Sequence, residues 1–240
     1  MYFDFIANIL FPPICLACKR RIARGVVCEA CFASISLRAG FLCGECHVPV
    51  ENPLAGASTC HPDFPYVLGA AADYADKTVQ SLVHHLKFRL IPGAAEPLAE
   101  LVEHYLTHTG IDLAGFVAVP IPLSPRRLRA RGYNQAELIA RHLTKKLKES
   151  GDGPAIATNI LIRAKHTKPQ SDTTSAAERK ENIHGAYAIH NSEAARAGIR
   201  GTNILLIDDV STSGATFLEA SRVLKAAGAE KIIAIAVAKT

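Results

Sequence analysis

Ile204-Leu205-Leu206-Ile207-Asp208-Asp209-Val210-Ser211-Thr212-Ser213-Gly214-Ala215-Thr216 sets four apolar residues before two adjacent carboxylates and a loop rich in hydroxyl groups. A short apolar run bounded by turn residues is typical of a buried strand in a parallel sheet. Residues 217–224 then show apolar side chains at helical spacing. The stretch therefore predicts a strand, a loop and a helix of an α/β fold, with the loop at the helix N-terminus.

The loop has the chemistry of a phosphate site. Backbone N–H groups and the positive end of a helix dipole favour an anion at a helix N-terminus. We expect the whole loop to bind a monophosphate: Ser211, Thr212, Ser213, Gly214, Ala215 and Thr216. The glycine lets the backbone approach the ligand closely. The loop lacks the lysine and spacing of a Walker motif and any G-x-G-x-x-G pattern, which excludes those nucleotide fingerprints.

The acidic pair Asp208 and Asp209 narrows the ligand further. Two carboxylates beside a phosphate would repel it unless they face groups that donate hydrogen bonds, such as ribose hydroxyls. A phosphorylated ribose satisfies both halves of the motif. The alternative is an ordinary strand-to-helix turn, in which Thr216 and Glu219 form a capping box and the two aspartates only end the strand.

The thirteen residues resemble the phosphoribosyl-pyrophosphate (PRPP) fingerprint of type I phosphoribosyltransferases. The blocks 119–135 and 170–186 and the cysteine-rich N-terminus resemble the competence-protein ComF family, so the resemblance covers nearly the whole chain. It implies an α/β fold: a parallel-sheet, type I phosphoribosyltransferase-like (Rossmann-like) domain with a small N-terminal zinc-ribbon module. We expect the module at residues 1–65 and the PRPP-binding domain at residues 66–240.

The resemblance also implies roles for individual residues. Asp208 and Asp209 would hold the ribose hydroxyls, and magnesium would bridge them to pyrophosphate. The polar segment 163–182 occupies the place of the superfamily's mobile hood loop, with Arg179 and Lys180 as its cations and Arg179 as a catalytic residue. The alternative for this segment is a surface loop without a site. Lys87-Phe88 matches the ComF pattern as well, but the sequence gives it no role.

The cysteines predict structural zinc. Cys15, Cys18, Cys28 and Cys31 form two C-x-x-C pairs, a complete four-thiolate set. Cys43, Cys46 and Cys60 form an incomplete second set, because Ala57 stands where a fourth cysteine is expected. His61 or His47 could complete it, or this half has lost its metal and packs as apolar residues. A redox C-x-x-C motif is a weaker alternative, since these pairs lie among turn residues.

Strands and helices alternate after residue 65, which favours a parallel sheet with its ligand at the carboxyl ends of the strands. We expect strands at 67–74, 115–121, 186–190, 203–207 and 232–238, and helices at 78–89, 94–108, 135–149 and from the loop to 227. No apolar run approaches a membrane span, and Asp4 stands where a signal peptide carries positive charge. With reduced cysteines, this favours a cytoplasmic protein.

The positive charge is concentrated in one segment. The chain has a formal net charge of +5, and residues 121–150 hold eight basic and two acidic side chains. Ile121 and Pro122 begin a loop after a predicted strand, and the guanidinium groups of Arg126 and Arg127 suit a pyrophosphate. Arg129 and Arg131 extend this cluster. Two alternatives explain the same residues. One is a solvated helix start, and the other is a basic surface that binds a nucleic-acid backbone and continues through Arg141, Lys145 and Lys148.

Three functions remain open on the sequence. The chain is a phosphoribosyltransferase with a nitrogen acceptor that no motif identifies, or a non-catalytic protein that binds PRPP and single-stranded DNA. The ComF resemblance implies a role in DNA uptake during natural transformation, with other competence proteins as partners. A zinc-ribbon nucleic-acid reader is less favoured, because residues 1–65 carry five basic and five acidic side chains. The oligomeric state is open.

Overall fold

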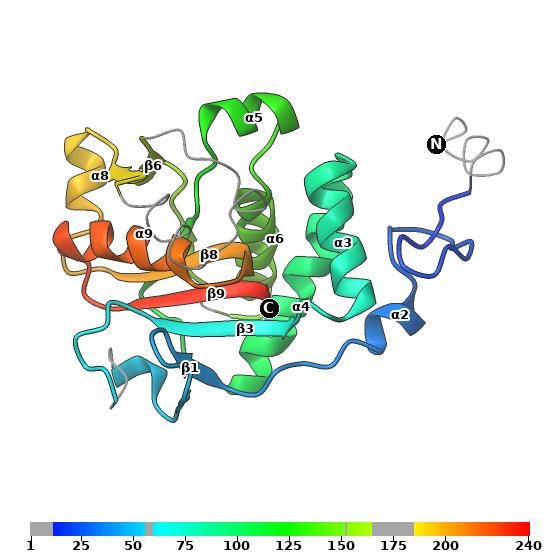
Figure 1. Cartoon of the computed structure of the whole chain (residues 1–240), viewed down its shortest axis with the longest axis horizontal. Helices are drawn as coiled ribbons and strands as arrows, with labels where there is room; N and C mark the ends of the chain where they lie inside the picture. The colour runs from blue at the N-terminus through cyan, green and yellow to red at the C-terminus, as the bar shows by residue number, and fades with distance from the viewer. Residues whose placement is uncertain (1–11, 56–59, 152, 165–184) are drawn as a thin grey trace.

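The computed structural model describes residues 12–55, 60–151, 153–164 and 185–240 (Figure 1). Its centre is a seven-stranded sheet with the order β2-β1-β3-β9-β8-β4-β5. The strands are β1 (Phe41–Cys43), β2 (Pro49–Val50), β3 (Val67–Asp73), β4 (Phe116–Pro120), β5 (Ala155–Ile156), β8 (Asn203–Ser211) and β9 (Ile232–Lys239). The five strands from β3 to β5 run parallel. The predicted α/β, mostly parallel fold is confirmed.

Helices cover both faces of the sheet. One apolar core contains α3 (Lys77–Phe88), the 3-10 turn η2 (Pro92–Ala94), α4 (Ala95–Thr109) and α6 (Gln135–Glu149). A second core contains α9 (Ala215–Ala226) on the other face. Figure 1 shows α3, α4 and α6 gathered on one side of the view, and α9 with α8 (Glu193–Ala197) on the other. Of the helices in the described part of the chain, none is long and apolar enough to cross a membrane.

The helix bounds agree with the apolar spacing, and capping explains where they begin. The Asp76 carboxylate accepts from Thr78 N and Val79 N at the start of α3, and Asn134 caps α6 in the same way through Ala136 N. Gly110, in the left-handed region at φ 64°, ends α4. The strands differ more from the predictions: β4 and β3 are a residue or two shorter at their ends, and β8 is four residues longer.

The longer β8 is the difference that matters for function. We expected the strand to end at Ile207, with the acidic pair after it. The ladder with β4 does end at the pair Pro120 and Ile207, but the ladder with β9 continues to Ser211 and Lys239. The acidic pair therefore lies within β8, in the part of the strand that has lost its neighbour on one side and faces an open edge.

The cysteine-rich segment is joined to the sheet. It contains α2 (Glu29–Ala33), the 3-10 turn η1 (Pro53–Ala55), β1 and β2. Strand β1 pairs antiparallel with β3, with Cys43 opposite Val67, so the two outermost strands on this side come from the zinc-ribbon region. The predicted boundary at residue 65 thus falls between two paired strands of one sheet.

A second, two-stranded sheet lies apart from the main one. It consists of β6 (Leu161–Arg163) and β7 (Tyr187–Ile189), paired antiparallel. Its residues Leu161 and Tyr187 belong to the same apolar core as α9. The short helix α5 (Pro125–Arg131) follows β4 and is capped by Ser124, whose hydroxyl accepts from Arg127 N. The strand β7 had been predicted at 186–190, whereas β6 and α5 had not, because such short elements leave no clear periodic pattern.

Candidate phosphoribosyl site and zinc clusters

A cleft of about 380 Å³ opens where β4 and β8 end. Its walls come from α3, the β4–α5 loop, α5, the start of α6, the β6–β7 sheet and β8. The lining residues are Lys87, Phe88, Ile121, Pro122, Leu123, Arg127, Arg131, Gln135, Arg163, Tyr187, Asp208, Asp209, Val210 and Thr216. The two aspartates thus share one cleft with several cations. The cleft lies at the carboxyl ends of parallel strands, where open α/β sheets bind their ligands.

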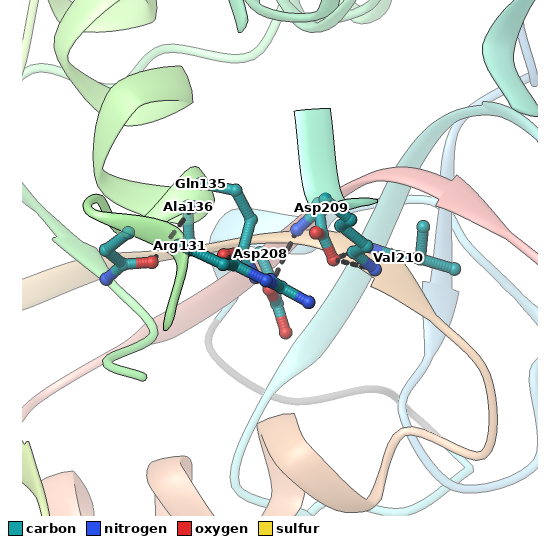
Figure 2. A network of polar contacts seen from close by, with 8 residues as sticks. Arg131, Gln135, Ala136, Asp208, Asp209 and Val210 are labelled. Atoms are coloured by element: carbon teal, nitrogen blue, oxygen red, sulfur yellow. Dashed lines mark hydrogen bonds and ion pairs between the residues drawn. The ribbon is translucent and has the colours of Figure 1, made fainter. Parts of the chain in front are cut away.

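The acidic pair is held by its own backbone. Asp208 Oδ1 accepts from Asp209 N at 2.8 Å, and Asp209 Oδ1 accepts from Val210 N at 2.7 Å. Asp209 is only 3% exposed, and its Oδ2 has no hydrogen-bond partner within the described residues. A buried carboxylate oxygen without a donor is costly, so a ligand hydroxyl that donates to it is favoured. Figure 2 shows the two side chains and these contacts.

Lys87 neutralises the buried carboxylate. Its Nζ lies 2.9 Å from Asp209 Oδ1, and the two side chains are 20% and 4% exposed. Lys87 is the penultimate residue of α3, far from β8 in sequence. The pair Lys87-Phe88, which the sequence left without a role, therefore forms one wall of the cleft.

The surroundings hold the neighbouring carboxyl group mainly protonated at neutral pH. Desolvation raises the pKa of Asp208 to about 8, the charge of Asp209 adds to this, and Lys87 opposes it. Two adjacent carboxylates with one lysine cannot both carry full charge at low cost. Further positive charge in the cleft would lower the pKa of Asp208 and favour its carboxylate form.

The loop after β8 holds polar groups that have no partner among the described residues. Gly214, in the left-handed region at φ 71°, is the N-cap of α9 and leaves the helix without a side-chain cap. Within the described residues, Ser211 Oγ and Ser213 Oγ are buried without a partner. The capping-box alternative is wrong, because α9 begins before Thr216 and Glu219 Oε1 instead accepts from Gly185 N at 2.6 Å. A hollow lined by Asp208, Val210, Ser211, Thr212, Gly214, Ala215, Thr216 and Phe217 follows the loop.

The basic segment separates into cleft residues and surface residues. Arg127 and Arg131 line the cleft, whereas Arg126 is exposed on α5. Arg131 donates to Gln135 Oε1 at 2.8 Å, and its guanidinium lies 5.6 Å from the centre of the Phe88 ring. In Figure 2, Arg131 and Gln135 lie beside the acidic pair. Lys87, Arg127 and Arg131 therefore line the same cleft as the carboxylates.

Asn134 explains how the β4–α5 loop is held. Its Nδ2 donates to the Ile121 carbonyl at 2.9 Å while its Oδ1 caps α6. Tyr133 beside it donates to the Leu86 carbonyl at 2.6 Å, which joins the same turn to α3. One short turn thus fixes the loop and two helices that line the cleft.

The β6–β7 sheet closes the cleft on the remaining side with Arg163 and Tyr187. Arg163 donates to the Tyr187 hydroxyl at 3.1 Å and lies 5.3 Å from the centre of its ring. The predicted hood residues Arg179 and Lys180 lie outside the described residues. The described chain stops at residue 164 and resumes at 185 beside this wall.

The first cysteine set converges on one point. The ligand atoms of Cys15, Cys18, Cys28 and Cys31 all lie within 4.8 Å of one another, and the Cys18 and Cys28 sulfur atoms are 3.8 Å apart. Tetrahedral zinc with Zn–S bonds of about 2.3 Å sets its sulfur atoms about 3.8 Å apart. Although desolvation acts the other way, backbone N–H groups of Cys18 and Cys28 lower the pKa of Cys15 to about 6. The set fits zinc.

The second cysteine set is completed by a histidine. The ligand atoms of Cys43, Cys46, Cys60 and His61 lie within 4.8 Å of one another, with Cys43 Sγ and His61 Nδ1 3.5 Å apart. His47 is not part of this group. A three-thiolate, one-imidazole set is an ordinary structural zinc site. His61 therefore stands in place of the missing fourth cysteine.

Sequence reasoning missed several residues of the cleft. Gln135 ends the block 119–135 and Arg163 begins the segment 163–182, but neither had been given a role in the cleft. No motif marks Tyr187, and a lysine at a helix end is ordinarily solvated. Only the Lys87-Phe88 match to the ComF pattern marked the α3 wall in advance. Arg131 had been recognised as part of a basic cluster, but spacing alone did not distinguish it from the exposed Arg126.

Comparisons with known proteins find matches to two segments of the chain. Residues 130–240 match the phosphoribosyl transferase domain, and residues 6–62 match the double zinc ribbon domain. DNA utilization protein YhgH of Escherichia coli K12 is 28% identical, over 92% of this chain and 94% of that protein. Competence protein F of Haemophilus influenzae is 37% identical over 48% of this chain and 46% of its own. Competence protein ComFC of Bacillus subtilis is 38% identical, over 45% and 38%.

Proposed function

We propose that this chain, which belongs to the competence-protein ComF family, binds PRPP in the cleft between β4 and β8 and transfers its phosphoribosyl group to a nitrogen acceptor. The arrangement of the described residues supports the proposal. A carboxylate pair and four cations line one cleft. The uncapped N-terminus of α9 borders a hollow that shares Asp208, Val210 and Thr216 with this cleft. PRPP carries the complementary groups: ribose hydroxyls, a 5-phosphate and a pyrophosphate.

Each part of the ligand has a matching part of the site. The loop 211–216, with the orphaned hydroxyls of Ser211 and Ser213, would bind the 5-phosphate. Asp208 and Asp209 would accept from the ribose hydroxyls. The pyrophosphate would contact Arg127 and Arg131 and the backbone at Ile121 and Pro122. Lys87 would contact both the pyrophosphate and Asp209. Arg126 stays a weaker candidate because it is exposed.

The same residues would assist the displacement of pyrophosphate. The cations stabilise the charge that develops on the leaving group, and the carboxylates orient the ribose for attack at C1. Magnesium, when bound, would supply further positive charge between the ribose hydroxyls and the pyrophosphate, and the carboxylate oxygens of the acidic pair are suitable ligands. Arg179 is proposed as an additional catalytic cation from the resemblance alone.

Calorimetric titration of PRPP with magnesium into the whole protein tests the binding step. We expect measurable binding that Asp209→Asn weakens by roughly tenfold or more, in line with a lost charged hydrogen bond. A transfer assay over a panel of bases and amines then tests catalysis. Binding without turnover would leave a PRPP-binding protein, and wild-type affinity of Asp209→Asn would contradict the assignment of the site.

Binding of single-stranded DNA is a second candidate function. Phe88 is 63% exposed and Leu128 is 44% exposed, and exposed arginines flank them at positions 89, 126 and 129. An aromatic ring among cations suits a stacked base and its backbone phosphates. Two of the relatives are named DNA utilization protein and competence protein, and these names are consistent with DNA binding. Other competence proteins are the partners that such a role implies.

We also propose that two zinc ions are structural parts of the protein, one held by Cys15, Cys18, Cys28 and Cys31 and the other by Cys43, Cys46, Cys60 and His61. Thiolate sites of this kind persist in a reducing compartment, which supports a cytoplasmic location. We also propose that the chain is divided into a module at residues 1–65 and a domain at residues 66–240.

A further inference from the structure

The second cysteine set is connected to the phosphate loop through two aromatic residues, Phe64 and Tyr66. Cys43 ends β1, and Gly44 after it is packed so closely that a Cβ there would stand 2.8 Å from the Tyr66 ring and clash with Phe64. Phe64 N donates to the carbonyl of His61 at 3.1 Å. Two residues of the set thus reach the pair Phe64 and Tyr66: Cys43 through the packing of its neighbour Gly44, and His61 through its carbonyl.

Tyr66 carries this contact to the loop. It is 2% exposed, its ring centre lies 5.1 Å from that of Phe64 and 6.0 Å from that of Phe217 in α9. Its hydroxyl donates to the Gly214 carbonyl at 3.3 Å, and a Cβ at Gly214 would stand 2.7 Å from the same hydroxyl. The N-cap residue of α9 therefore rests directly on Tyr66.

We propose that Tyr66 is a positioning residue through which the second zinc set, Cys43, Cys46, Cys60 and His61, holds the phosphate loop 211–216 in its ligand-binding shape. The inference depends on the proposed function for its consequence, which is a PRPP affinity that changes with occupancy of this zinc set. Loss of the metal frees the turn at Gly44 and the His61–Phe64 turn. Tyr66 then no longer fixes the Gly214 carbonyl, and the loop loses its preorganised donors.

The first cysteine set has a different neighbour. Leu16, between Cys15 and Cys18, accepts a hydrogen bond through its carbonyl from Ser81 Oγ of α3 at 2.8 Å. Figure 1 shows α2 and the chain before it beyond α3, whereas β1 lies beneath β3 at the other end of the view. Loss of metal from the first set should therefore loosen α3 and leave the loop 211–216 in place. This difference supplies a control.

Tyr66→Phe in the full chain removes only the hydroxyl, and Tyr105→Phe is the matched control. Tyr105 is equally buried and also donates to a glycine carbonyl, that of Gly40. Calorimetry with ribose 5-phosphate, PRPP and inorganic pyrophosphate separates the loop from the rest of the cleft. We expect Tyr66→Phe to weaken ribose 5-phosphate and PRPP by about three- to tenfold, to leave pyrophosphate within about twofold, and Tyr105→Phe to change none of them.

Hydrogen exchange of the ligand-free protein tests the same inference without PRPP. We expect the amides of residues 212–217 to exchange faster in Tyr66→Phe and in His61→Ala, with the zinc content of His61→Ala measured in parallel. In Cys18→Ser the faster exchange should appear in α3 instead. Unchanged exchange at 212–217 in both Tyr66→Phe and His61→Ala would overturn the inference. If wild-type protein bound no PRPP while this exchange pattern appeared, the proposed function would be wrong, but the positioning of the loop 211–216 by Tyr66 would still be supported.

Discussion

Lys87 of α3 and Asp209 of β8 form an ion pair of 2.9 Å at the floor of the cleft, where the lysine is 20% exposed and the aspartate 4%. The pair joins the helix that contacts the first cysteine set to the strand that carries the acidic motif. It also keeps a buried negative charge compensated before any ligand arrives. The site is therefore assembled from two segments, α3 and β8, that lie far apart in the sequence.

Lys87→Met should destabilise the protein by about 2–4 kcal/mol, because it leaves the buried Asp209 carboxylate without its cation. Urea denaturation of the ligand-free protein measures this. Lys145→Met is the matched control, since Lys145 pairs with Glu149 at 3.9 Å on the surface and its loss should cost about 0–1 kcal/mol. Equal effects of the two substitutions would show that the cleft pair is no more than a surface contact.

PRPP affinity should rise with pH between about 7 and 9. Desolvation and Asp209 raise the pKa of Asp208 to about 8. Asp208 accepts hydrogen bonds from ribose hydroxyls and coordinates magnesium best as a carboxylate, and the fraction in that form increases as the pH passes the pKa. Titration calorimetry at several pH values gives the slope. Asp208→Asn should bind more weakly and lose that part of the slope, while titration of PRPP itself remains in both proteins.

The same pKa shift has the opposite effect on the stability of the free protein. Because the folded pKa of Asp208 lies above the unfolded one, its contribution favours folding below pH 4 and is lost as pH rises toward 8. Asp208→Asn should therefore stabilise the free protein by roughly 1–3 kcal/mol at pH 8, and by less at pH 5. A variant that is less stable at pH 8 would contradict the assigned direction of the shift.

Gly214→Ala should weaken phosphate-ester binding and lower the melting temperature together. The residue lies in the left-handed region at φ 71°, and a Cβ would stand 2.7 Å from the Tyr66 hydroxyl. We expect a loss of about 1–3 kcal/mol in stability. Gly115→Ala, at φ 74° with open space around it, carries the backbone strain without the clash, and it should leave ribose 5-phosphate affinity unchanged.

Protein produced under reducing conditions should hold two zinc ions per chain. Metal analysis of Cys28→Ser and His61→Ala should each show the loss of one ion, because each substitution removes a ligand of a different set. His47→Ala, outside both sets, should retain both. A zinc content of one in the wild type would mean that one of the two sets is empty, and the variant that keeps this ion would show which one.

Single-stranded DNA binding, where present, should depend on α5 more than on α6. The α6 stripe is partly neutralised, since Arg141 pairs with Glu137 at 2.7 Å and Lys145 with Glu149. Arg126→Ala/Arg129→Ala should therefore weaken salt-sensitive DNA binding and flatten its salt slope more than Arg141→Ala/Lys145→Ala. Fluorescence anisotropy at two or more salt concentrations measures both effects. A stronger effect of the α6 substitutions would instead assign DNA binding to the basic residues of α6.

Much of this architecture could be predicted because its elements are periodic. The helices α3, α4, α6 and α9 show apolar residues at helical spacing and ordinary caps, and their bounds fall within about two residues of the expected ones. The strand β8 was predicted too short, since Asp208 and Asp209 resemble a strand end to any composition rule. Only the pairing with β9 up to Lys239 keeps them in the ladder.

The candidate site was predictable where a motif is local and not where it is assembled by the fold. The loop 211–216 and both cysteine sets are contiguous or regularly spaced, so their residue types were enough. Lys87 and Tyr66 act on β8 and Gly214 across more than a hundred residues of chain. No spacing rule connects such pairs, and the choice of His61 over His47 likewise depended on three-dimensional proximity.

Strand β9 pairs with β3 on one side and β8 on the other, although it is the last strand along the chain. During synthesis the ribbon segment and β3 leave the ribosome first, and they must wait for residues 232–239 before the parallel sheet can close. Until then β3 has only β1 as a partner and would expose its other edge. During this interval β1 would already occupy one edge of β3, so the ribbon segment would leave only the β9 side of that strand open.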